Sequence, residues 1–321
     1  MPIPASRPSL VERAVIKMQR EQAKDQPRKA SRASDIAPNG VVIAAPPSID
    51  GARTNAFRKD LREGLRPAAE DSAPELLVID AQRLGRKGYV IPGADPNRTA
   101  NEFRTIKRPL LHNVERHGAT PAASRRRIMV TSALAGEGKT FCAINLALSL
   151  ANERDYSVLL VDADIARPSV PRQLGILERT GLMDALVDPS IDPATLVLPT
   201  SIDKLSILMA GRAHPKATEL LASTAMKALL ERITSSYPDR IILFDSPPLL
   251  ATTESSVLAS HMGQIVLVVE TGKTRREAVK AALASLESTD GVISLVMNKS
   301  APPGKKALLR YGGYGYGYGE A

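Results

Sequence analysis

The sequence lacks the features of a secreted or membrane-spanning protein. Cys142 is the single cysteine in 321 residues, so no internal disulfide can form and the chain fits a reducing compartment. No segment approaches the run of about 20 apolar residues that crosses a bilayer, and the N-terminus has no charged-then-apolar export pattern. We therefore expect a soluble, cytoplasmic protein, for which any role at a membrane needs a partner.

Aromatic side chains are also scarce, at 3% of the residues. The net charge is +9 and its excess is N-terminal, because residues 1–127 contain 24 Lys and Arg against 14 Asp and Glu, whereas residues 128–321 contain 19 against 20. A basic segment could bind nucleic acid or anionic lipid, but this one is interleaved with acids and has almost no rings to stack on bases. We expect a solvated N-terminal third and no nucleic-acid partner.

The first 74 residues divide into a short helix and a linker. In residues 1–22, Ser9 is placed to cap an amphipathic helix, with Glu12 three positions on as in a capping box. Residues 23–74 are rich in Pro, Ala, Ser, Arg and Asp without periodicity, and cannot bury enough apolar surface to offset the entropy of ordering. We predict a docking helix followed by a largely disordered linker.

An extension over residues 75–118 precedes the main domain. Apolar residues such as Phe103 and Leu110 are spaced for a helix over residues 99–117. Pro109 is expected to interrupt or kink this helix, because proline cannot donate a backbone hydrogen bond.

From residue 119 to residue 300, short apolar runs alternate with longer helical patterns. Four runs are continuous and rich in Ile, Val and Leu, as buried parallel strands require: 128–132, 157–161, 241–245 and 265–269. This alternation predicts an α/β fold with a doubly wound, mostly parallel sheet. Residues 301–321 then form a low-complexity tail rich in tyrosine and glycine.

A phosphate-binding loop is predicted between the first of these strands and the next helix. The stretch SALAGEGKT, residues 132–140, has the sequence and the strand-to-helix context of a Walker A loop. Gly136 and Gly138 allow backbone amides to turn toward phosphates, Lys139 neutralises their charge, and Thr140 offers a hydroxyl to Mg²⁺. These features predict a P-loop nucleotide site.

Acidic residues follow two of the predicted strands. Asp162 and Asp164 share one side of an extended chain, since strand side chains alternate, and Asp245 ends another apolar strand. The carboxyl ends of parallel strands meet at the sheet edge where α/β folds bind ligands. We expect the three carboxylates to lie near the metal of a bound nucleotide.

Together these segments resemble a known family. SALAGEGKT, LLVDADIARPS and ILFDSPP resemble the Walker A, Walker A′ and Walker B motifs of the bacterial tyrosine kinases. SLVERAVIKMQRE, EFRTIKRPLL and FDSPPLLATTESSVLA are most similar to the autokinases of exosortase-associated exopolysaccharide clusters. The resemblance implies a protein-tyrosine kinase that uses ATP and Mg²⁺ and is separate from its membrane-spanning activator, a polysaccharide co-polymerase.

The resemblance also implies roles for single residues. The catalytic residues would be Lys139, Asp162, Asp164, Arg167 and Asp245. The nucleotide would be bound by Ala135, Gly136, Glu137, Gly138, Lys139, Thr140, Phe141 and Asn298, and Mg²⁺ by Thr140, Asp162 and Asp245. Asp164 would orient or deprotonate the tyrosine hydroxyl, whose pKa of about 10 requires such help. Arg167 would steady the loop or the transferred phosphate, or else form a surface ion pair, and Asn298 would contact adenine.

The tail supplies candidate phosphoacceptors, namely Tyr311, Tyr314, Tyr316 and Tyr318. A flexible segment of about 20 residues spans roughly 25 Å, which allows transfer in trans within a homo-oligomer. Each phosphate adds about −1.5 to −2 charges. Phosphorylation would therefore loosen an assembly held by a basic face of Arg104 and Lys107, and a tyrosine phosphatase would reset it.

Two other interpretations remain open. A ParA- or MinD-like ATPase switch would share the α/β domain, but such proteins usually carry an extra lysine early in the Walker A loop, where this chain has Leu134. A non-catalytic regulatory subunit would bind nucleotide and a membrane partner without phosphorylating either.

Overall fold

The computed structural model describes residues 76–94, 97–116, 121–237 and 239–300. The predicted docking helix over residues 1–22, the linker over residues 23–74 and the tyrosine tail over residues 301–321 lie outside the described residues.

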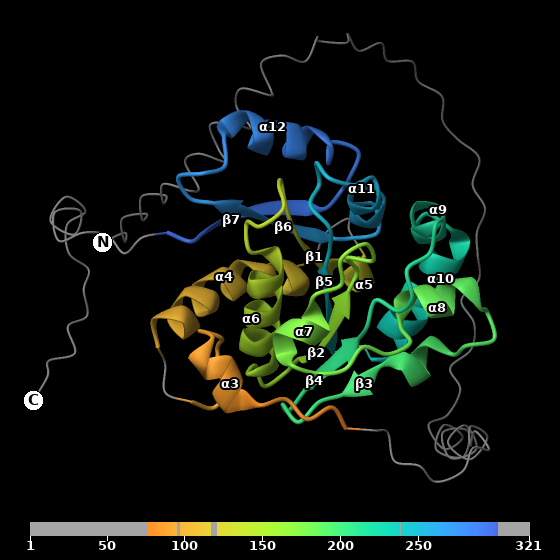
Figure 1. The fold of residues 1–321 in the computed structure, drawn as a ribbon, viewed down its shortest axis with the longest axis horizontal. Coiled ribbons are helices and arrows are strands. Elements are labelled where there is room, and N and C mark those ends of the chain that lie inside the picture. Colours follow the sequence, from red (N-terminus) through yellow and green to blue (C-terminus); the bar gives the residue numbers. More distant parts are fainter. Residues whose placement is uncertain (1–75, 95–96, 117–120, 238, 301–321) are drawn as a thin grey trace, which may run out of the picture. The chain divides into compact units, whose positions relative to one another are not determined.

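The described part is an α/β domain (Figure 1). Its strands are β1 (Arg127–Ser132), β2 (Ser157–Asp162), β3 (Leu198–Pro199), β4 (Leu205–Leu208), β5 (Arg240–Asp245), β6 (Gln264–Glu270) and β7 (Val292–Asn298). Its helices are α3 (Ala81–Arg86), α4 (Arg98–Glu115), α5 (Ala122–Arg125), α6 (Lys139–Ala151), α7 (Val170–Leu174), α8 (Leu182–Val187), the 3₁₀ helix η1 (Pro193–Leu196), α9 (Ala217–Leu221), α10 (Thr224–Ser236), α11 (Glu254–Ala259) and α12 (Arg276–Ala284).

The strands form one sheet in the order β3-β4-β2-β5-β1-β6-β7, in which β3 alone is antiparallel to its neighbour. The chain starts near the middle at β1 and winds outward in both directions, which makes the sheet doubly wound, as predicted. The four runs expected as buried strands are β1, β2, β5 and β6, and nearly all of their residues are buried. Continuous apolar runs are needed because helices cover both faces of the sheet.

Alternate residues of each strand contribute to two separate cores. Val130, Leu160 and Leu243 face the core formed with α3, α4, α6 and α7. Met129 and Phe244 face the core formed with α8 to α12. In Figure 1 the first set of helices is grouped apart from α8, α9 and α10. The two-residue period of the strands therefore divides the domain into its layers.

The extension is part of the first core. Leu84 of α3 and Phe103, Leu110 and Leu111 of α4 are buried there with residues of α6 and the sheet. Ahead of α3, Leu77 forms a bridge with Thr200 at the β3 edge of the sheet. The segment thus packs as an integral part of the α/β domain.

The expected interruption at Pro109 is wrong, because α4 continues through it from Arg98 to Glu115. Pro109 lies on the exposed face of the helix. Thr105 is exposed as well, so its carbonyl, which loses its usual donor four residues on, can be hydrated instead. The buried face, with Phe103 and Leu110, keeps its packing.

The expected exposed face of Arg104 and Lys107 is wrong for Lys107, which is 3% exposed. Its Nζ donates to the Ser149 carbonyl at 2.6 Å and pairs with Glu153 Oε1 at 2.7 Å, both near the end of α6. A long side chain can reach such partners while its stem packs in the core. Arg104 is exposed, as expected.

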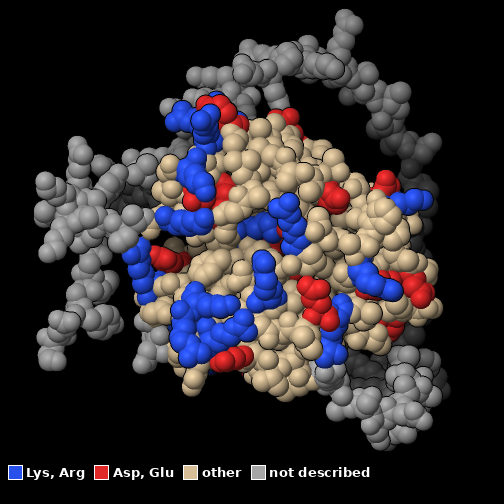
Figure 2. Space-filling view, in the orientation of Figure 1, with Lys and Arg blue, Asp and Glu red and all other residues tan. Residues whose placement is uncertain are grey.

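A basic surface nevertheless covers this part of the molecule. On the face drawn in Figure 2, Lys and Arg side chains gather where Figure 1 places α3 and α4. The exposed arginines of these two helices are Arg86, Arg98, Arg104 and Arg108. Among the described residues, no helix is both long enough and apolar enough to span a membrane.

Candidate functional site

The predicted phosphate loop connects the carboxyl end of β1 to the start of α6. β1 lies next to β5, and β5 lies next to β2, with Asp162 directly opposite Asp245 in the register. Because these strands are parallel, the Walker loop and both strand-end aspartates reach the same sheet edge. Motifs that are far apart in the sequence thus lie close together in the structure.

The loop has the backbone of a phosphate cradle. Gly136 and Gly138 have φ values of 86° and 94°, in the left-handed region that favours glycine. At Gly138 a Cβ atom would overlap the side-chain amide of Asn298, so a larger residue would have to displace Asn298. The first helical bond of α6 runs from the Cys142 amide to the Gly138 carbonyl at 3.0 Å. The earlier amides of the helix therefore have no intrahelical acceptor and are available to an anion.

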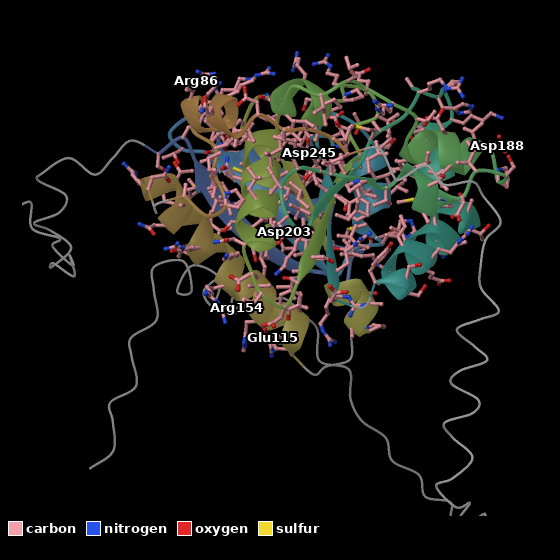
Figure 3. The ribbon with its side chains drawn as sticks, turned by 90° about the horizontal axis from the view of Figure 1, so that it is seen from below. Arg86, Glu115, Arg154, Asp188, Asp203 and Asp245 are labelled. Carbon is pink, nitrogen blue, oxygen red and sulfur yellow. The ribbon has the colours of Figure 1, made fainter. Side chains whose placement is uncertain are left out.

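Lys139 and Thr140 meet two of the predicted carboxylates. Lys139 Nζ lies 2.7 Å from Asp164 Oδ2 and 3.6 Å from Asp245 Oδ1. The Thr140 hydroxyl donates to Asp245 Oδ2 at 2.6 Å. Figure 3 shows Asp245 among the interior side chains, away from Glu115 and Arg154 at the margin of the fold. The structure thus brings together Lys139, Thr140, Asp164 and Asp245.

Asp162 is turned toward the start of α7. Its Oδ2 accepts the amides of Ser169 and Val170, each at 3.0 Å, and its Oδ1 accepts the amide of Asp164 at 3.2 Å. It makes no ion pair with Lys139 among the described residues. Its link to the site runs through Ser169, whose hydroxyl lies 2.9 Å from that of Thr140. Asp162 therefore shapes the loop that contains Asp164.

The electrostatics of the cluster favour an added cation. Burial raises the pKa of Asp245 to about 6, while Lys139 and Thr140 oppose part of that rise. Burial also raises the pKa of Asp162 to about 7, and the charge of Asp245 adds to the effect. For Lys139, burial favours the neutral amine, but the nearby carboxylates outweigh it and raise the pKa. The Lys139 ammonium thus faces more buried carboxylates than it can neutralise alone. A divalent ion bound there would also stabilise their ionised forms.

The geometry fits a phosphate with a bound Mg²⁺. Asp245 Oδ1 is buried and accepts no hydrogen bond from the described residues. The described residues contain no preformed cluster of three or more His, Cys, Asp or Glu side chains that could hold a metal. Mg²⁺ commonly takes one or two carboxylates and completes its shell with phosphate oxygens and water. A hydroxyl and one unsatisfied carboxylate oxygen beside a phosphate cradle match that requirement.

The other predicted site residues lie around the loop. Ala135 and Arg167 are exposed, and the Arg167 amide donates to Asp164 Oδ1 at 3.1 Å. The Phe141 ring packs against Tyr89 of the extension, with the ring centroids 5.0 Å apart and the planes tilted by 41°. The group of Phe141 that can meet phosphate is therefore its backbone amide. Asn298 Nδ2 donates to the Glu137 carbonyl at 2.8 Å.

Three residues in contact with this site were missed by the sequence analysis. Ser169 ends the quoted segment LLVDADIARPS, so its place in the motif could have indicated it. Thr274 donates to Glu137, and Lys299 donates to the Gly136 carbonyl at 2.7 Å. No local sequence pattern indicates either residue, because Thr274 follows β6 and Lys299 follows β7, both far from the phosphate loop in the sequence.

Comparison with known proteins identifies relatives of two kinds. Residues 123–304 match the family model of ParA, described as the NUBPL iron-transfer P-loop NTPase. The tyrosine-protein kinase YwqD of Bacillus subtilis (strain 168) is 33% identical over 218 residues, which cover 68% of this chain and 85% of that protein. The tyrosine-protein kinase CpsD of Streptococcus agalactiae is 28% identical over 197 residues, covering 60% and 81%.

A solved structure agrees with these relatives. The crystal structure of the VpsO kinase domain superposes with a TM-score of 0.54 and 29% identity, covering 63% of this chain and 95% of that domain. The iron transfer named in the family description has no cysteine pattern to support it here, since iron–sulfur clusters need several thiolates and Cys142 is single and buried. The shared feature is the P-loop fold.

Proposed function

The chain belongs to the ParA-type P-loop NTPases and, within them, to the bacterial tyrosine-protein kinases, and we propose that it phosphorylates its own C-terminal tyrosine cluster in trans. The observation that carries this proposal is the contact of Lys139 Nζ with Asp164 Oδ2 at 2.7 Å. It joins the group that would neutralise the γ-phosphate to the group that would receive the tyrosine proton.

ATP and Mg²⁺ are the proposed substrate and cofactor. The amides of Ala135 to Phe141 and the Lys139 ammonium would hold the phosphates, and Asn298 would meet adenine through the amide oxygen that no described residue engages. Thr140 and Asp245 would hold Mg²⁺, with Asp162 supporting the shell through Ser169 or water. Bound there, Mg²⁺ would neutralise charge that develops on the phosphoryl oxygens.

Asp164 is the proposed proton acceptor. It is 5% exposed, and its Oδ1 accepts a hydrogen bond from the Arg167 amide, which orients the carboxylate within the A′ segment. As the phenolic oxygen bonds to the γ-phosphorus, the bond from phosphorus to the β,γ-bridging oxygen breaks, and the phenol proton passes to Asp164. The exposed Arg167 guanidinium is free to meet the transferred phosphate, because no described residue pairs with it.

The four tail tyrosines are the proposed acceptors. Purified protein is incubated with γ-labelled ATP beside three variants: Lys139→Met, all four of Tyr311, Tyr314, Tyr316 and Tyr318 changed to Phe, and Tyr237→Phe as the matched control. Tyr237 is an exposed domain tyrosine, so its loss should leave labelling unchanged. We expect label in the wild type and the control alone.

Two other results of this experiment would favour a different function. ATP hydrolysis without label in the wild type would favour the ATPase switch. Neither hydrolysis nor label, with nucleotide still bound, would favour the non-catalytic regulatory subunit.

Transfer in trans needs its own experiment. The Lys139→Met variant keeps its acceptor tail, and the variant with four phenylalanines keeps its catalytic site. Mixing the two should place label on the Lys139→Met chain alone. An unlabelled mixture, with an active wild type, would show that each chain modifies only itself.

The proposed setting is the control of exopolysaccharide polymerisation or export at the inner membrane. The partners implied by the family resemblance are a membrane-spanning co-polymerase that activates the kinase, a tyrosine phosphatase that resets it and further copies of this chain. Support for an assembly is the exposed basic surface of Arg86, Arg98, Arg104 and Arg108. A multiply phosphorylated tail would bind this surface, neutralise its charge and so loosen the assembly. Sedimentation of the phosphorylated and dephosphorylated protein tests this, and equal oligomer sizes would contradict it.

A further inference from the structure

The outer side of the phosphate loop is held by three side chains from the β6–β7 region. Asn298 Nδ2 donates to the Glu137 carbonyl at 2.8 Å, and Lys299 Nζ donates to the Gly136 carbonyl at 2.7 Å. The Thr274 hydroxyl donates to the Glu137 carboxylate. We propose that Thr274, Asn298 and Lys299 form a clamp that aims the amides of the loop at phosphate, and that they are positioning residues for phosphoryl transfer.

The planarity of the peptide bond explains how the clamp would act. In a trans peptide the carbonyl of one residue and the amide of the next point in opposite directions. Lys299 and Asn298 hold the carbonyls of Gly136 and Glu137 on the outer side of the loop. The amides of Glu137 and Gly138 are thereby turned toward the inner side, where a phosphate would bind.

Glu137 fixes the loop between its two left-handed glycines. Gly136 and Gly138 have no Cβ to restrict their own dihedral angles, so contacts from other residues have to fix the conformation of the loop. The Glu137 side chain is 2% exposed, and its Oε2 accepts the Leu134 amide at 2.7 Å within the loop. Its Oε1 accepts the Thr274 hydroxyl and, at 3.4 Å, the Glu270 amide. One carboxylate therefore ties both halves of the loop to the end of β6.

The clamp is braced by further charges on its outer side. Glu270 Oε2 lies 3.1 Å from Lys299 Nζ and 3.3 Å from Lys273 Nζ. This ion pair holds Lys299 over the Gly136 carbonyl, although both lysines are partly exposed and the pair is screened by solvent. Thr274 and Lys299 reach the loop from beyond β6 and β7, and neither side chain needs to touch the nucleotide. Asn298 would hold the loop through its Nδ2 and meet adenine through its amide oxygen.

Thr271 provides a matched control. Its hydroxyl lies on the same turn as that of Thr274, but it is 2.8 Å from the Ser300 hydroxyl and makes no hydrogen bond to the phosphate loop among the described residues. Thr271→Val and Thr274→Val thus remove the same hydroxyl from positions three residues apart, and only one of them bonds to Glu137. Thr274→Ser keeps the hydroxyl, and Lys299→Met removes the ammonium while keeping the stem.

The experiment measures the dissociation constant of a fluorescent ADP with Mg²⁺ on the full chain, together with Tm. We expect Thr274→Val and Lys299→Met each to weaken binding about 5- to 10-fold, as the loss of one charge-assisted hydrogen bond allows. Thr271→Val and Thr274→Ser should stay within about twofold of the wild type. Affinities are compared well below each Tm, so that partial unfolding does not mimic weak binding.

Wild-type affinity in both Thr274→Val and Lys299→Met, or an equal loss in Thr271→Val, would overturn the clamp. Because the clamp rests on the proposed function, the same proteins are assayed for tail labelling. Normal labelling with unchanged affinities would overturn the clamp alone, whereas clamp-sensitive ADP binding without tail labelling would overturn the kinase proposal alone.

Discussion

The buried ammonium of Lys107 permits a sharp test of whether the extension is part of the catalytic domain. Its two partners, the Ser149 carbonyl and Glu153, belong to α6 and its end, and α6 begins at the phosphate loop. We expect Lys107→Met to lower the free energy of unfolding by about 2 kcal/mol.

The magnitude follows from the contacts. Loss of a hydrogen bond from a charged donor costs about 1.5–3 kcal/mol, and the Ser149 carbonyl would lose its Lys107 donor in a buried position. Two effects reduce the cost. The Met side chain fills the space of the lysine stem, and Glu153, at 22% exposure with Arg108 3.9 Å away, can be hydrated. For a domain of this size, the predicted loss corresponds to a fall in Tm of about 4–8 °C.

The assay is urea unfolding followed by circular dichroism, with Arg104→Met as control. Arg104 lies on the same helix but is exposed, and among the described residues its guanidinium donates only to Asn101 Oδ1, at 3.3 Å. Its replacement should change stability by less than about 0.5 kcal/mol. If Lys107→Met is as stable as the wild type, or if both variants lose the same stability, the buried placement of Lys107 is refuted. Lys107 would then belong to an exposed basic face.

Asp184→Asn should lower unfolding stability by about 1–2 kcal/mol near neutral pH. Burial opposes ionisation of Asp184, but its bonds to Arg212 and nearby amides prevail and lower its pKa. The stability that Asp184 contributes is therefore fully present above its unfolded pKa of about 4 and is lost as the pH falls through its lower pKa in the folded protein. A stability difference between wild type and Asp184→Asn that is the same at pH 3 as at neutral pH would contradict this. Tyr89→Phe should cost about 0.5–1.5 kcal/mol in urea unfolding, because the hydroxyl loses its bond to Gln173, and equal midpoints would count against that bond. Burial raises the pKa of the Cys142 thiol to about 12, so iodoacetamide at pH 8 should label it only in urea, and rapid native labelling would show that it is accessible.

The sequence alone was enough for the sheet and for the centre of the site. Continuous apolar runs identified four central strands, and GEGKT between a strand and a helix identified the phosphate loop. Lys139 and Thr140 are neighbours in the chain, and Asp245 ends a strand that has to reach the same edge. These features depend on local sequence patterns and on the common direction of parallel strands, and both can be inferred from the sequence.

The tertiary structure decided which side chains those elements meet. Lys107 and Arg104 have the same character in the sequence, yet only Lys107 faces α6, 42 residues further on. Asn298 is predicted to contact adenine, and what the structure shows is that its amide donates to the Glu137 carbonyl, 161 residues away. Pro109 is tolerated because it falls on the solvent side of α4. Burial and long-range hydrogen bonds depend on how layers pack against each other, and no local spacing encodes that packing.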